Sequence, residues 1–248
     1  MDLPPTGDIV LVVIGALAAG FVNGLTGTAY ALAALGFWLH AMSPLTAAPL
    51  VALCAVGGHV QALRHIWHGV RWPRLWPFLA AGLVGVPIGT VLLAHVRVQP
   101  LKIGVGALLL VYCIWMYFVR KPPVVTAGGR IADGAVGFVG GVLGGMASLS
   151  GPVPIIWVQL RSWGKAEQRG LNQPYNMAIL GAALLSAAVA GLLDRTFLLW
   201  AVIALPTTLV GARLGLMLYG RVDEVQFRKL VLVLLGLSGA ILIVSSLK

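Results

Sequence analysis

Neutral hydrogen-bonding side chains gather in two short, glycine-rich segments of the chain. The two sets are Asn23, Thr26, Thr28 and Tyr30 in the first segment, and Ser148 and Ser150 in the second. Hydroxyl and amide groups can donate hydrogen bonds to the oxygens of an anion without carrying charge themselves. The alternative is that each hydroxyl bonds back to a carbonyl of its own helix. The first interpretation predicts an anion-binding site built from both segments.

A second group of polar side chains lies in or near apolar stretches. Asn172, Gln173 and Asn176 open one stretch, where they either cap a helix or contact a solute. Arg213 is the one cation well inside a predicted span, where it either forks onto an oxyanion or snorkels to the membrane surface. His59 either couples protons to transport or lies at the membrane interface.

The acidic residues and cysteines argue against an enzyme. All seven carboxylates lie in predicted loops or at the ends of apolar stretches: Asp2, Asp8, Asp133, Glu167, Asp194, Asp223 and Glu224. None is left for paired-acid or metal-assisted hydrolysis inside a membrane. Cys54 and Cys113 match no metal or redox spacing, and the chain has no nucleotide-binding loop. We therefore expect no catalytic residue, no metal and no cofactor.

The composition identifies the elements that must position these groups. Of the 248 residues, 59% are apolar and 10% are charged, against roughly 25% charged in a soluble domain. A membrane-spanning helix needs about 20 apolar residues. Eight stretches qualify: 9–39, 45–63, 75–94, 102–119, 134–160, 172–193, 197–219 and 230–247. The expected fold class is all-α, a polytopic membrane protein.

Two of the eight stretches are too long for one straight crossing. Residues 9–39 would form a helix of about 46 Å and residues 134–160 one of about 40 Å. Small and polar residues interrupt each near its middle, at 23–28 and at 144–152. Glycine lowers helix propensity, and proline removes a backbone donor. Both stretches are therefore predicted to be broken helices or helical hairpins.

The chain also repeats itself. Residues 20–27 align with 137–144 at an offset of 117, and five of the eight positions are identical. Gly85 and Gly89 match Gly211 and Gly215 at an offset of 126. These glycines also suit close helix packing, which is an alternative to a role in binding. The predicted halves are 1–125 and 126–248, within one integral membrane domain.

Charge distribution favours hairpins. If every stretch crosses once, the two sides of the membrane carry eight Lys and Arg each, leaving out Arg213. If both long stretches return to their starting side, twelve gather on one side and four on the other, as the positive-inside rule expects. The twelve are Arg64, Arg71, Arg74, Arg120, Lys121, Arg130, Arg161, Lys165, Arg169, Arg221, Arg228 and Lys229. The halves would then form an inverted repeat with both termini outside.

Broken helices at matching places in inverted repeats are typical of secondary transporters, with the solute near the bilayer midplane. Helix N-termini at such breaks favour an anion. The net charge of +10 fits cytoplasmic loops better than a nucleic-acid partner, because no basic stripe with interleaved aromatics is present. The expected partners are a small anion and the bilayer, and a homo-oligomer stays open.

The doubled glycine-rich segment, residues 58–72 and the stretch 85–89 resemble the sulfite exporter TauE/SafE family over nearly the whole chain. This resemblance implies a multi-pass permease of the bacterial inner membrane that moves sulfite, organosulfonates or related small anions, often outward. Two alternatives stay open: a channel-like conduit for the same anions, and a membrane enzyme or scaffold.

Overall fold

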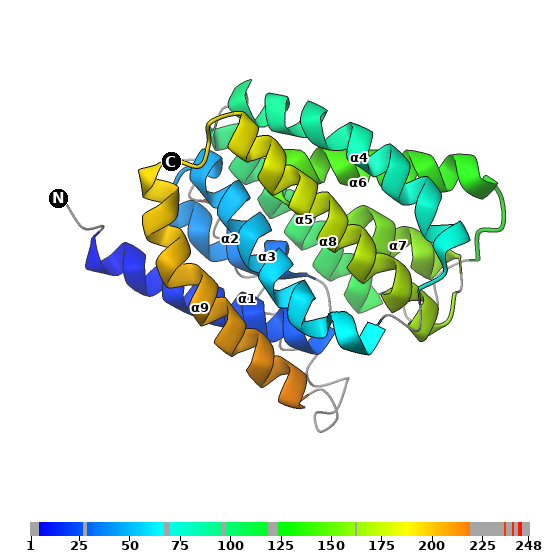
Figure 1. Ribbon diagram of the computed structural model, residues 1–248, viewed down its shortest axis with the longest axis horizontal. Coiled ribbons are helices and arrows are strands. Elements are labelled where there is room, and N and C mark those ends of the chain that lie inside the picture. Colours follow the sequence, from blue (N-terminus) through cyan, green and yellow to red (C-terminus); the bar gives the residue numbers. More distant parts are fainter. Residues whose placement is uncertain are drawn as a thin grey trace.

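The computed structural model is helical throughout the residues that it describes. Those residues are 5–26, 29–66, 70–95, 98–118, 124–161, 163–218, 236, 240, 243 and 244. Figure 1 labels the helices: α1 (Thr6–Thr26), α2 (Tyr30–Ala41), α3 (Pro44–Ile66), α4 (Trp72–His95), α5 (Val98–Phe118), α6 (Gly129–Ala147), α7 (Pro152–Leu160), α8 (Lys165–Val189) and α9 (Arg195–Leu218). The predicted stretch 230–247 falls almost entirely outside the described residues.

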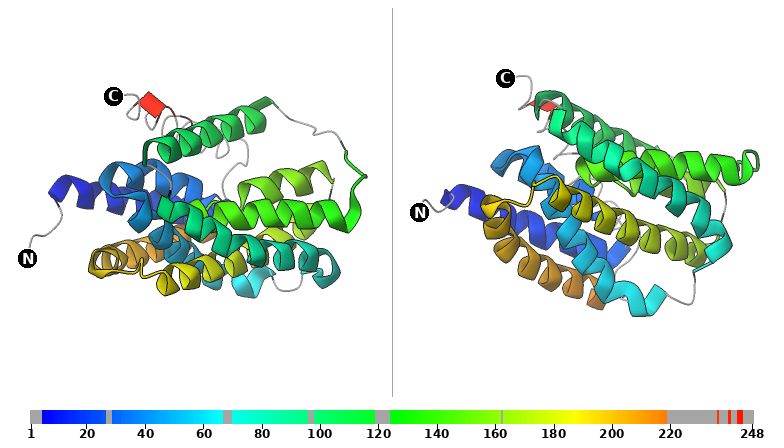
Figure 2. Two further views of the ribbon diagram at one scale, coloured as in Figure 1. Left: turned by 90° about the horizontal axis from the view of Figure 1, so that it is seen from above. Right: turned by 45° about the horizontal axis from the view of Figure 1, so that its top comes forward.

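Among the residues that the structure describes, four helices are long and apolar enough to cross a membrane. They cover Thr6–Leu25, Pro44–Gln61, Trp72–His95 and Arg195–Leu218. The buried core lies mainly between α2 and α3, around Trp38 and Leu50, which are fully enclosed. Figure 2 shows α5 at the edge of the bundle, where it contacts α2.

The first long stretch forms a helical hairpin. Helix α1 ends at Thr26 and α2 begins at Tyr30, with Ala29 between them in the left-handed region at φ 67°. Helix α2 then runs back along α1, since the Trp38 indole N–H donates to the Val12 carbonyl at 3.2 Å. The interruption expected in 9–39 is therefore present.

The second long stretch forms a hairpin of the same kind. Helix α6 ends at Ala147, and the left-handed Ser148, at φ 56°, closes it by donating its backbone N–H to the Gly144 carbonyl at 2.8 Å. Helix α7 begins at Pro152 and returns along α6, because the Trp157 indole N–H reaches Asp133 Oδ1 at 2.7 Å. The interruption expected in 134–160 is present as well.

Glycines join the helices into two close parallel pairs. In α1, Gly20 and Gly24 face the backbone of α9, where Gly211 and Gly215 face α1 in turn. In the same way α4 and α6 meet through five glycines: Gly85, Gly89, Gly137, Gly141 and Gly145. A Cβ at these positions would meet backbone atoms of the neighbouring helix. Gly20, Gly24, Gly137 and Gly141 therefore serve packing, which was the alternative to a role in binding.

The two pairs begin at opposite ends of the bundle. Helices α1 and α9 start at one end, and α4 and α6 start at the other, as the sequence colours of Figure 1 show. The starts of α4 and α6 and the end of α7 carry Arg71, Arg74, Arg130 and Arg161. We call this the cationic end.

Replacing Gly141 by Ala should destabilise the protein by about 1 to 3 kcal/mol, because the new methyl group would press on the Gly82 backbone. Gly181 is the matched control, since nothing lies within 4 Å of a Cβ there. Gly181→Ala should be neutral or stabilising by up to about 1 kcal/mol. Unfolding in mild detergent measures both, and equal effects would contradict the packing role.

Candidate functional site

The break between α1 and α2 is lined by buried polar groups from three helices, α1, α2 and α9, and by Gly58 of α3. The side-chain amide nitrogen of Asn23 in α1 lies 2.7 Å from where a Cβ of Gly58 in α3 would stand. The hydroxyl of Tyr30 in α2 lies 2.7 Å from Thr208 Oγ1 in α9. Asn23, Tyr30 and Thr208 are each less than 5% exposed. Thr28 and the side chain of Thr26 lie outside the described residues.

The break between α6 and α7 is tied to two other helices. Ser148 donates from its hydroxyl to the Ala48 carbonyl in α3 at 2.6 Å. Ser150 donates to Oδ1 of Asn176 in α8 at 2.8 Å. These hydroxyls, like that of Tyr30, bond to other helices rather than to carbonyls of their own. The alternative of local back-bonding is thus wrong for all three, and their bonds hold the breaks in place.

Four buried side chains on helices that line the breaks carry polar atoms that lack a hydrogen-bond partner within the described part of the chain. The atoms are Asn23 Oδ1, His59 Nδ1, Asn172 Oδ1, and both Oε1 and Nε2 of Gln173. Buried polar atoms are nearly always paired, so each exception needs an explanation. The side chains are three amides and one imidazole, and they come from α1, α3 and α8. Such groups can bind a solute through hydrogen bonds.

One contact near the first break has a counterpart near the second, 117 residues further along the chain, but the large side chain comes from the other helix of the pair. Asn23 of α1 faces Gly58 of α3, and 117 residues later Gly140 of α6 faces Tyr175 of α8. The Tyr175 hydroxyl is already used, since it donates to the Gly137 carbonyl at 2.7 Å. The first break therefore offers an unpaired amide oxygen, Asn23 Oδ1, where the second has a phenol that is already hydrogen-bonded.

Helix α8 begins earlier than the sequence predicts. It starts at Lys165, so Asn172, Gln173 and Asn176 lie about two to three turns inside it and do not cap its start. The capping interpretation is wrong. Glu167 in the added first turn pairs with Arg71 and Arg74, which explains why a polar turn continues the helix.

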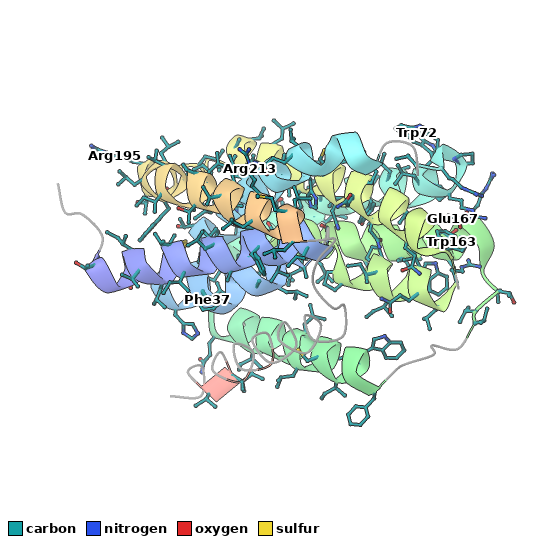
Figure 3. The ribbon with its side chains drawn as sticks, turned by 90° about the horizontal axis from the view of Figure 1, so that it is seen from below. Phe37, Trp72, Trp163, Glu167, Arg195 and Arg213 are labelled. Carbon is teal, nitrogen blue, oxygen red and sulfur yellow. The ribbon has the colours of Figure 1, made fainter. Side chains whose placement is uncertain are left out.

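The structure also places His59 and Arg213. The side chain of His59 is 3% exposed and is enclosed by protein, two residues before the end of the apolar span Pro44–Gln61. Arg213 lies on the exposed side of α9 (Figure 3), apart from the buried polar groups. Its position fits snorkelling, and the structure does not bring it to the breaks.

Sequence reasoning missed one residue of this region, Thr208. The signal available was a polar residue two positions after a proline, Pro206, inside an apolar helix. Among the described residues, no three His, Cys, Asp or Glu side chains are grouped to hold a metal ion.

Comparison with known proteins gives one match. The family model described as "Sulfite exporter TauE/SafE" matches residues 12–242. No curated protein and no solved structure is similar enough to match. Because the family match covers nearly all of the 248 residues, the chain belongs to the sulfite exporter TauE/SafE family of membrane transporters.

Proposed function

We propose that the protein is a secondary transporter, working as an exporter, of small sulfur-containing anions such as sulfite or organosulfonates. The family match supports a transporter of sulfite-like anions. The observation that carries the site is the set of four buried side chains with unpaired atoms on the helices that line the two breaks. Gln173 Nε2 can donate to an oxyanion, and the unpaired amide oxygens can accept from an O–H or N–H group of the solute. Asn23, His59, Asn172 and Gln173 are the contacts that we assign to the solute.

The other predicted site residues act around these contacts. Tyr30, Ser148 and Ser150 fix the breaks, and Asn176 is held by Ser150. Thr26 and Thr28 stay predicted contacts at the first break. Helix α7 adds few backbone donors, because Pro152 and Pro154 carry no N–H. The start of α2 therefore contributes more than the start of α7 to the binding of an anion.

The proposed mechanism is alternating access between two inverted halves, 1–125 and 126–248. It is supported by the parallel pairs α1 with α9 and α4 with α6, which begin at opposite ends of the bundle. Exchanging the halves converts one pair into the other, as an inverted repeat requires. The cationic end would face the cytoplasm of a bacterial inner membrane.

Counterflow in proteoliposomes tests the transporter. Vesicles loaded with unlabelled sulfite should take up labelled sulfite with saturable kinetics, and organosulfonates inside should replace sulfite. Uptake that never saturates would instead indicate the channel-like conduit. Thermal-shift measurements with sulfite, taurine, sulfoacetate, sulfate and thiosulfate rank the solutes, and stabilisation by none of them would contradict the assignment.

A further inference from the structure

A surface pocket opens at the cationic end, and none of the residues that line it belongs to either break. It has a volume of about 410 Å³ and is lined by Trp72, Pro73, Trp76, Pro77 and Arg130. Trp72 is 53% exposed and Trp76 is 62% exposed. Four apolar or aromatic side chains and one guanidinium therefore form its wall, at the starts of α4 and α6.

The other described arginines of the cationic end are already paired. Arg71 and Arg74 contact Glu167 at 2.8 and 2.7 Å, and Arg161 contacts Asp133 at 3.2 Å. No carboxylate among the described residues pairs with Arg130, which is exposed. The pocket therefore contains a guanidinium available to an anionic group from outside the chain.

The pocket continues into an apolar face along α4. Val84, Ile88 and Val91 follow Trp76 on this helix and are 63%, 45% and 60% exposed. From Trp76 to Val91 the helix rises about 22 Å, more than half of the roughly 30 Å hydrocarbon core. A molecule bound at Arg130 would thus have an apolar surface beside it that is long enough for one leaflet of acyl chains.

We infer that this pocket binds the headgroup of an anionic phospholipid. Its phosphate pairs with Arg130, the indole rings of Trp72 and Trp76 lie at the level of the headgroups, and the acyl chains run along α4. Tryptophan is enriched at the membrane interface, and basic pockets at helix ends bind anionic lipid headgroups. A zwitterionic lipid has the same chains but lacks the net charge that Arg130 selects.

Native mass spectrometry of the purified full chain tests this, with phosphatidylglycerol and phosphatidylcholine of identical chains. Phosphatidylglycerol should bind more tightly, and Arg130→Gln should weaken its binding about fivefold while leaving phosphatidylcholine unchanged. Arg195→Gln is the control, since Arg195 is also exposed but begins α9 at the opposite end. Trp76→Leu should weaken both lipids without removing the preference.

Three results would overturn the inference. The first is equal binding of the two lipids, and the second is an equal effect of Arg130→Gln and Arg195→Gln. The third is displacement of phosphatidylglycerol by free glycerol 3-phosphate at similar concentration, because that would make the pocket a site for a soluble phosphate. Both arginines are exposed, so a loss of binding in either variant should not reflect unfolding.

Discussion

Gln173→Leu should lower the rate of sulfite counterflow about tenfold or more while the protein still folds. Gln173 is 1% exposed, and both polar atoms of its side chain lack a partner within the described structure. A hydrogen bond to a charged solute is worth about 1.5 to 3 kcal/mol. Because about 1.4 kcal/mol corresponds to a factor of ten, losing this bond should lower the flux about tenfold or more. Leucine has nearly the same volume and leaves no polar atom unpaired.

The stability of this variant separates a solute contact from a structural role. Removing two unpaired buried groups should keep or raise the unfolding temperature. The matched control is Gln168→Leu on the same helix, where the side chain donates to the Trp163 carbonyl at 2.7 Å near the cationic end. It should leave counterflow unchanged. Unchanged counterflow in Gln173→Leu would remove Gln173 from the site, whereas a loss of folded protein would show that its unpaired atoms serve the fold.

The hairpins could be predicted because two independent properties of the sequence agree. Stretches 9–39 and 134–160 exceed the length of one crossing, and glycine or proline interrupts both. If each stretch crosses once, the Lys and Arg residues divide equally between the two sides of the membrane, whereas a return of both stretches places twelve on one side and four on the other. Local propensity and global charge thus point to the same arrangement, which the helices α1, α2, α6 and α7 adopt.

Helix ends were harder to predict because tertiary contacts set them. Hydropathy begins the stretch that becomes α8 at residue 172, but the helix starts at Lys165, and the ion pairs of Glu167 hold its additional polar residues. Hydrophobicity alone carries no information about such partners.

The orientation of Arg213 was predictable from its neighbours. Gly211 and Gly215 face α1, which fixes the rotation of α9. A residue two positions from each glycine points about 200° away from the first, on the opposite side of the helix. Arg213 is therefore directed outward, and a small-residue stripe is the signal that separates a snorkelling arginine from one in a binding site.

Arg161→Gln should destabilise the protein by about 3 to 5 kcal/mol. Arg161 closes the open end of the hairpin formed by α6 and α7: it pairs with Asp133 at 3.2 Å and donates to the carbonyls of Thr126 and Gly129 at 3.1 Å each. The side chains of Arg161 and Asp133 are each 11% exposed. Removing one partner of a buried pair leaves the other charge uncompensated, which is the costly case.

The control for this variant is Arg74→Gln at the same end of the bundle. Arg74 is 40% exposed, and Glu167 would keep Arg71 at 2.8 Å, so the change should stay below about 1 kcal/mol. Unfolding in mixed detergent micelles measures both variants. Equal effects of the two substitutions would contradict the stabilising role that we assign to the buried Arg161–Asp133 pair.

The double variant Asp133→Asn with Arg161→Gln tests the same ion pair, which we call the clamp, without leaving an unpaired charge. It should recover part of the stability lost in Arg161→Gln, because the remaining carboxamides can still bond to each other and to Trp157. The same variants also test transport, because α7 connects the second break, next to Ser150, to the Arg161–Asp133 ion pair. If the clamp positions that break, counterflow should fall with stability in Arg161→Gln and return with it in the double variant.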